Sequence, residues 1–204
     1  MKDELLDFND REKKLMFDRE IFPTKHRINE KIISLFNAIG IELKDKLSHQ
    51  LFTDVEPITF KITKGENYLH QPYLILDIPK INPSRDILVF RCMFWYGHFF
   101  SISLLATGNK AIAISKKLEH YSFLKTDWQF SIAHNPWNHD FNSEYFKPLH
   151  TLSEKEINMH INTYQYLKLS CKITSTTISE IQKEFIERVR EFETLLSGSS
   201  DTFA

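Results

Sequence analysis

Residues 87–105 read ILVFRCMFWYGHFFSISLL, and this stretch decides the fold. Two long apolar runs, 87–95 and 98–105, lie on either side of Gly97. Apolar runs rich in β-branched and aromatic residues and joined by a short turn are typical of a β-hairpin. Both faces of this hairpin are apolar. That pattern is typical of central strands covered on both sides, or of a face that closes over a ligand or partner.

Shorter segments extend this sheet in both directions along the chain. Residues 58–63 and 128–132 alternate between apolar and polar side chains, and residues 73–78 form another apolar run. Together with the hairpin, these segments predict a central antiparallel sheet of about five strands within residues 58–133.

Helical patterns precede and follow the strands. Apolar residues at helical spacing within 28–39 predict a helix before the sheet, and the apolar stripe within 178–196 predicts a long helix after it. A capping box of Ser153 and Glu156 opens another helix, whose stripe runs to Leu167. Consecutive strands between groups of helices indicate an α+β fold rather than an alternating α/β fold.

Length and composition fit one α+β domain over residues 1–204. Hydrophobic residues make up 42% of the chain and charged residues 26%, which is ordinary globular usage. Residues 1–22 are rich in charge and predict an exposed helical arm, whereas residues 197–204 predict a frayed tail.

Charge and the length of the apolar runs exclude two classes of partner. The formal net charge is −1 and no basic block stands out, so we expect no nucleic-acid partner. The apolar runs are shorter than the roughly 20 residues that span a bilayer, and the N-terminus lacks the apolar segment of a secretory signal. Two cysteines are too few for a disulfide framework. We therefore expect a cytoplasmic protein that does not bind membranes.

The sequence also lacks the motifs of common nucleotide-binding and hydrolase families. It contains only five glycines and no G-x-G-x-x-G, G-x-x-x-x-G-K or G-x-S-x-G. Glycine lets backbone amides approach phosphate, so Rossmann and P-loop functions are disfavoured, as is an α/β-hydrolase. No cofactor is predicted on this reasoning.

Arg91 is the first residue that could carry function, because it lies in the middle of an apolar strand, where a charge needs a partner. Asp77 is the only acid in the neighbouring predicted strand. We expect a structural Arg91–Asp77 ion pair. The alternative is an anion site on the sheet, since a guanidinium group binds carboxylate or phosphate through two hydrogen bonds.

Small polar residues among aromatic ones are a common lining of ligand pockets. If Trp95 faces His98 across the turn, Ser101 and Ser103 share a face with Phe90 and Cys92. A sheet covered by helices accommodates the same small residues, so both interpretations stay open. The candidate ligand-binding residues are Arg91, Trp95, His98, Ser101, Ser103 and Trp137.

Residues 134–150 predict a long ordered loop, and such loops are often functional. His134, His139 and His150, with Asp140, are of the residue types that zinc and other divalent transition metals prefer. Their spacing matches no established metal motif. Histidines in a loop of this composition more often hydrogen-bond to the backbone and hold the loop in shape.

Two functions follow from these observations. We expect a non-enzymatic module that binds a small molecule or a protein through the aromatic sheet and the 134–150 loop. The alternative is a metal-dependent hydrolytic enzyme that uses the histidines of that loop, whose bound metal would activate water near neutral pH. The catalytic residues of such an enzyme are not identified, and a homodimer is compatible with the sequence.

Overall fold

The computed structural model of the chain describes residues 7–47, 52, 57–118 and 127–197. Its strands form one antiparallel sheet in the order β1-β2-β3-β4-β7-β5-β6. The strands are β1 (Lys61–Tyr68), β2 (Gln71–Ile78), β3 (Leu88–Trp95), β4 (Phe100–Thr107), β5 (Gln129–Ser131), β6 (Phe146–Pro148) and β7 (Tyr166–Ile173). The helices are α1 (Asp10–Met16), α2 (Ile21–Lys46), α3 (Gly108–Leu118), α4 (Glu154–Tyr164) and α5 (Ile178–Ser197), with a short 3-10 turn at Leu149–Thr151.

This architecture confirms the predicted α+β fold, with an antiparallel sheet between N-terminal and C-terminal helices. The sheet has seven strands in the described ranges, where about five were expected within residues 58–133. Both additional strands, β6 and β7, lie beyond residue 133. The tail predicted for 197–204 lies outside the described residues beyond position 197, as does the start of the predicted arm, 1–6.

Strand β7 replaces the end of a predicted helix. The helix ends at Tyr164, because Gln165 adopts a left-handed conformation with φ 59°. From Tyr166 onward the side chains alternate between the two faces of the sheet, and almost all of them are buried. Lys168 is buried within this alternation. A polar residue of β7 therefore does not have to face solvent.

The hairpin of β3 and β4 has the predicted place in the sheet but a different register. Trp95 donates its backbone N–H to the carbonyl of Phe99 at 3.0 Å, so Trp95 faces Phe99 and not His98. The turn therefore has one more residue than expected, with Gly97 at φ 74°. A shift of one residue moves every side chain of a strand to the other face. Ser103 consequently lies opposite Arg91.

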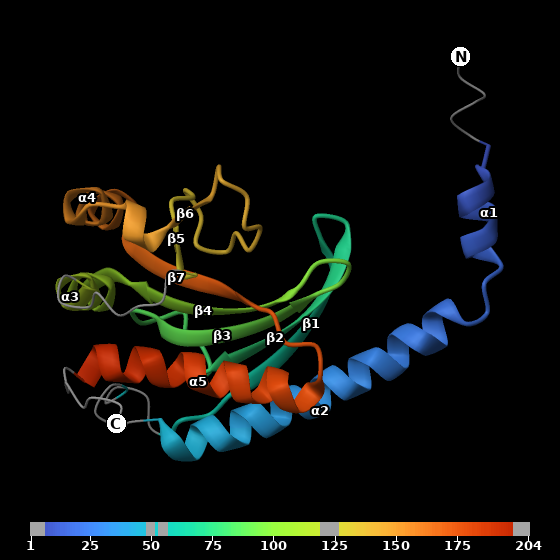
Figure 1. Ribbon diagram of the computed structural model, residues 1–204, viewed down its shortest axis with the longest axis horizontal. Helices are drawn as coiled ribbons and strands as arrows, with labels where there is room; N and C mark the ends of the chain where they lie inside the picture. Colours follow the sequence, from blue (N-terminus) through green and yellow to red (C-terminus); the bar gives the residue numbers. More distant parts are fainter. Residues whose placement is uncertain (1–6, 48–51, 53–56, 119–126, 198–204) are drawn as a thin grey trace.

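One face of the sheet is covered by helices and contains the main core. Figure 1 shows α2 and α5 running side by side along this face, with α3 and α4 at one end of the sheet. Phe36 and Phe185, from the two long helices, contact each other edge to face at 6.3 Å between ring centroids. Phe90 of β3 packs against Phe192 of α5 at 5.9 Å. Burial of these aromatic side chains, with the aliphatic residues beside them, stabilises the packing of α2 and α5 on the sheet.

The opposite face, hereafter the second face, is covered by a loop instead of helices. Residues 132–145, hereafter the covering loop, connect β5 to β6 and lie on the side of the sheet away from α2 and α5 (Figure 1). Among the described residues, no helix has the length and apolar character needed to cross a membrane.

Candidate functional site

A row of polar side chains crosses the second face. Antiparallel pairing aligns Asp77 of β2 with Arg91 of β3, Arg91 with Ser103 of β4, and Ser103 with Ser170 of β7. Residues paired in this way have Cβ atoms within roughly 5.5 Å of each other, so their side chains interact. The strand order thus collects four polar groups from distant parts of the chain.

Arg91 and Asp77 form a buried ion pair with two hydrogen bonds, as predicted. The guanidinium donates from Nε to Oδ1 of Asp77 at 2.7 Å and from Nη2 to Oδ2 at 2.9 Å. Both side chains are about one-tenth exposed. This geometry uses both carboxylate oxygens and leaves Nη1 of Arg91 directed toward other groups.

The other members of the row are paired with each other. The hydroxyls of Ser103 and Ser170 lie 2.7 Å apart, close enough for one to donate to the other. Ser101, the neighbouring residue of β4 on the second face, is buried and lies opposite Met93 of β3 and Lys172 of β7. The serines therefore line the second face beside Arg91.

The covering loop adds His139 and Trp137 to this row. The backbone N–H of His139 donates to the hydroxyl of Tyr68 at 2.7 Å, which anchors the loop to β1. The His139 ring is buried, and its Nε2 lies 3.4 Å from Nη1 of Arg91. The ring of Trp137 lies 4.7 Å from the guanidinium carbon of Arg91, in cation–π contact, and Trp137 is 40% exposed.

Lys168 of β7 completes the site, and sequence reasoning missed it. Its side chain is 1% exposed. Its Nζ donates to the carbonyls of Pro136, at 3.1 Å, and Asn138, and lies 3.3 Å from Nδ1 of His139. Within the described part of the chain, Lys168 has no carboxylate partner. The available signal was a lysine between two leucines in a segment that alternates as a strand does.

These four residues, Asp77, Arg91, His139 and Lys168, form what we call the buried polar cluster. A neutral imidazole offers one N–H and one lone pair, whereas guanidinium and ammonium groups only donate. If Nη1 of Arg91 donates to Nε2 of His139, then Nδ1 of His139 carries the hydrogen and points at Lys168. All groups are satisfied when Lys168 is a neutral amine, because its lone pair accepts from Nδ1–H while its two hydrogens go to the two carbonyls.

The electrostatic environment favours the same protonation states. Burial, followed by the positive charge of Arg91, lowers the pKa of Lys168 well below its usual 10.5. Burial, followed by the charges of Lys168 and Arg91, lowers the pKa of His139 well below 6.5. The hydrogen-bond count and the pKa directions therefore agree on a neutral imidazole and a readily deprotonated amine.

The structure places the six candidate ligand-binding residues in two neighbouring groups on or over the second face. Arg91 and Ser103 lie at the buried polar cluster with Trp137 above them, and Ser101 lies one position further along its strand. His98 is exposed and stacks on the buried ring of Trp95, with 3.5 Å between ring centroids. Tyr68 joins the two groups, because its ring contacts both Trp95, at 5.1 Å, and His139, at 5.7 Å.

The predicted metal ligands do not come together. His139 is buried between two basic side chains, whereas His134 is exposed and packs against Tyr164. His150 is exposed in the short 3-10 turn. Among the described residues, no group of three or more His, Cys, Asp or Glu side chains is arranged to hold a metal ion. Asp140 therefore has no pair of neighbouring histidines with which it could bind a metal ion.

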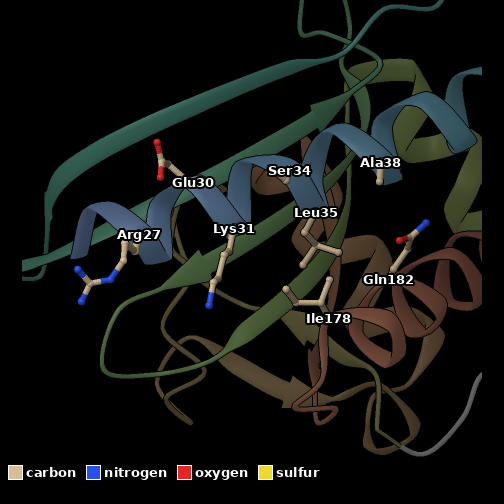
Figure 2. A pocket seen from close by; sticks show the side chains of 8 residues that line it. All are labelled: Arg27, Glu30, Lys31, Ser34, Leu35, Ala38, Ile178 and Gln182. Atoms are coloured by element: carbon tan, nitrogen blue, oxygen red, sulfur yellow. The ribbon is translucent and has the colours of Figure 1, made fainter. Parts of the chain in front are cut away.

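A second hollow lies between α2 and α5, on the far side of the molecule from the cluster. Figure 2 shows this groove, with Leu35 and Ile178 pointing toward each other from the two helices and charged residues along α2. Its volume is about 430 Å³. The residues that line it are Arg27, Glu30, Lys31, Ser34, Leu35, Ala38, Ile178 and Gln182. This set contains no histidine or cysteine and does not resemble a catalytic constellation.

The two cysteines lie in the core under the helices. Both thiols are free and buried, and burial raises the pKa of Cys92 well above its usual 9.0. A thiol held in this way does not form the thiolate that nucleophilic catalysis requires.

No protein-family model, curated protein or solved structure matches this chain. Its function therefore has to be inferred from the chemistry of the second face.

Proposed function

We propose that this protein is a non-enzymatic module that binds a small organic anion, with a carboxylate or phosphate group, at the buried polar cluster. The observation that carries the proposal is the charge balance of the cluster. Two basic side chains, Arg91 and Lys168, are buried there with a single carboxylate, Asp77. A buried ammonium without a counter-charge is costly, so the free protein favours the neutral amine. An anion supplies the missing charge.

The arrangement of donors supports this ligand class. The His139 ring lies between Nη1 of Arg91 and Nζ of Lys168, at 3.4 Å and 3.3 Å. A carboxylate or phosphate in place of that ring would accept from both basic groups, and the hydroxyls of Ser103 and Ser170 lie in the same row. Arg91 keeps Asp77 as its second partner and so remains oriented.

Entry of the ligand requires the covering loop to move. The Trp137 ring that covers Arg91 is partly exposed, so its displacement opens the guanidinium to solvent. Several contacts tie this part of the loop to the sheet. Tyr68 bonds to His139 and Asn138, Lys168 donates to two loop carbonyls, and the His139 ring lies against Arg91 and Lys168. Protonated Lys168 prefers the anion, whereas neutral Lys168 holds the loop, so binding shifts the loop between two positions.

A cytoplasmic location is part of the proposal. Two free cysteines buried in a core are typical of proteins from a reducing compartment. The metal-dependent hydrolase remains an alternative prediction, and no contact among the described residues favours it over anion binding.

Calorimetric titration with defined anions tests the proposal. The probes are acetate, malonate, benzoate and inorganic phosphate, added at pH 7.5 with chloride at equal ionic strength as the reference. We expect at least one probe to bind and, because binding protonates Lys168, to take up roughly one proton per anion, measured from the dependence of heat on buffer ionisation.

Matched lysine variants give the control. Lys168→Met should abolish binding and proton uptake together. Lys172→Met should leave both unchanged, because Lys172 lies on the same strand and face but is exposed, over the ring of Phe99. Binding by Lys168→Met with the affinity of the wild type, or no binding of any probe by the wild type, would refute the proposal.

A further inference from the structure

Large apolar side chains are exposed in an unusual concentration near the N-terminus. Phe17 is 78% exposed and Phe22 is 73% exposed. Apolar side chains scattered singly over a surface are ordinary, whereas a cluster of them marks an interaction site. The exposed members of this cluster are Phe8, Leu15, Met16, Phe17 and Phe22.

These residues belong to a segment that projects from the body of the protein. Figure 1 shows α1 and the first turns of α2 extending beyond the sheet. None of the residues of α1 is buried, and the buried residues of α2 begin at Ile32. α2 is fixed to the sheet from Lys25 onward, because Lys25 pairs with Glu66 of β1 and the hydroxyl of Tyr96 donates to the carbonyl of Lys25 at 3.2 Å and to Asn29 at 2.9 Å. A continuous helix is stiff, so the first turns of α2 extend away from the domain, and α1 continues outward from them through the non-helical residues 17–20. Residues 7–22 are hereafter the arm.

The charges of α1 identify the partner. Asp10 and Glu12 lie in its first turn with Arg11 between them, and Asp7 precedes the helix, so this end is negative on balance, whereas Lys13 and Lys14 make the last turn positive. When two copies of α1 pair antiparallel about a two-fold axis, the acidic turn of each lies beside the basic turn of the other. The helix dipoles are then also antiparallel, which is the favourable arrangement. The segment is therefore complementary in charge to itself.

The apolar side chains fit the same arrangement. Phe8 directly precedes the N-cap Asn9 and Leu15 lies in the last turn of α1, so the two apolar side chains flank this helix at its opposite ends. Antiparallel pairing brings the Phe8 end of one copy to the Leu15 end of the other. A two-fold interface of this kind closes on itself, so it gives a dimer instead of an open chain of copies.

We infer that the arm is a dimerisation surface and that its occupant is the arm of a second copy of this chain. A membrane surface is a poorer match, because residues 7–22 contain five acidic and four basic side chains and therefore offer no net positive charge to anionic lipids. The inference is independent of the anion site, since none of its residues lies on the second face.

Sedimentation of the full chain with two charge variants tests the inference. The variants are Asp7→Lys with Asp10→Lys, and Lys13→Glu with Lys14→Glu. Glu12 is kept because it forms the capping box of α1 with Asn9. We expect the wild type to dimerise and each variant alone to dimerise at least tenfold more weakly. A 1:1 mixture of the two variants should restore the dimer, because their arms carry opposite charges.

A second pair of variants tests whether dimerisation depends on the apolar side chains of the arm or on apolar side chains exposed elsewhere. Phe17→Ser with Phe22→Ser should also weaken the dimer at least tenfold, whereas Ile41→Ser, at an exposed apolar position of α2 outside the arm, should not. A wild type that is monomeric throughout, dimers that persist in the arm variants, or a variant mixture that stays monomeric would each overturn the inference. Binding of monomers to phosphatidylcholine–phosphatidylserine vesicles through the arm would do so as well.

Discussion

Nζ of Lys168 lies 3.3 Å from Nδ1 of His139, and this contact joins the covering loop to the middle of the sheet. Neither residue has an acidic partner in the contact, and Arg91 lies on the other side of the imidazole. A buried group that is easily deprotonated thus holds a loop in place by accepting and donating hydrogen bonds as a neutral amine. The protonation of Lys168 and the position of the loop are therefore linked.

Removing the amine should loosen the loop. Lys168→Met leaves the carbonyls of Pro136 and Asn138 and Nδ1 of His139 without their partner. Unsatisfied buried groups cost about 1–3 kcal/mol, so we expect a loss of that size in the free energy of unfolding, measured with urea. Amide exchange at His139 should accelerate. Lys172→Met should change the free energy of unfolding by less than about 0.5 kcal/mol, as surface substitutions do.

The same lysine should make stability depend on alkaline pH. The pKa of Lys168 is lowered in the folded state, so the unfolded state binds a proton that the folded state has released. Stability therefore rises as the pH increases from the lowered pKa toward 10.5 and is constant above it. The advantage of wild type over Lys168→Met should grow from pH 7 to pH 10. A constant difference would show that Lys168 keeps its proton in the fold.

Stability should fall in acid because of His160. Its ring is buried against Phe130 and Tyr166, and burial, with a smaller effect of His134, lowers its pKa to about 4. The folded state thus stays neutral while the unfolded state takes up a proton below pH 6.5. The contribution is complete above pH 6.5 and is lost as the pH falls toward 4, by up to about 1.4 kcal/mol per pH unit.

A phenylalanine at this position should remove that dependence. Nε2 of His160 is buried and has no hydrogen-bond partner in the described structure, so His160→Phe replaces an unsatisfied polar atom among aromatic rings. We expect a gain of about 1 kcal/mol at pH 7 and a larger one at pH 5. His150→Phe, at an exposed site, should leave the slope of stability against pH unchanged. Equal slopes for His160→Phe and the wild type would contradict the assignment.

The Arg91–Asp77 pair should show strong coupling. Arg91→Met leaves the Asp77 carboxylate buried without its partner, and Asp77→Leu does the same to the guanidinium, so each should cost about 3–5 kcal/mol. The double variant should cost much less than the sum, because it leaves no unpaired charge. Chemical denaturation of all four proteins measures the cycle, and additive losses would mean that the two charges are stabilised by other groups.

Much of the fold could be predicted from local pattern. The apolar runs around Gly97 place the central hairpin, and an arginine among apolar residues with one acid in the next strand identifies the ion pair. The register of β4 could not be predicted, because a turn of two residues and a turn of three residues look alike in sequence. The two turns place every side chain of β4 on opposite faces of the sheet.

The key residues of the site were hidden for a different reason. Lys168 and His139 are 29 positions apart and meet only because β7 inserts beside β4 and the covering loop folds back over it. The spacing of apolar residues along the sequence does not predict such a contact. His139 is a candidate from residue type alone, but its ring lies between two basic side chains, Arg91 and Lys168, and not at the metal that its residue type suggested.

The position of β7 has a consequence for synthesis on the ribosome. β1 to β4 form a meander that can pair as soon as residue 107 has emerged, yet β4 pairs on its other side with β7, which ends at residue 173. Until then the nascent chain presents an unpaired strand edge flanked by apolar side chains, a known route to aggregation. Translation of this chain should accordingly draw on chaperones over the interval between β4 and β7, and a fragment ending at residue 165 should precipitate.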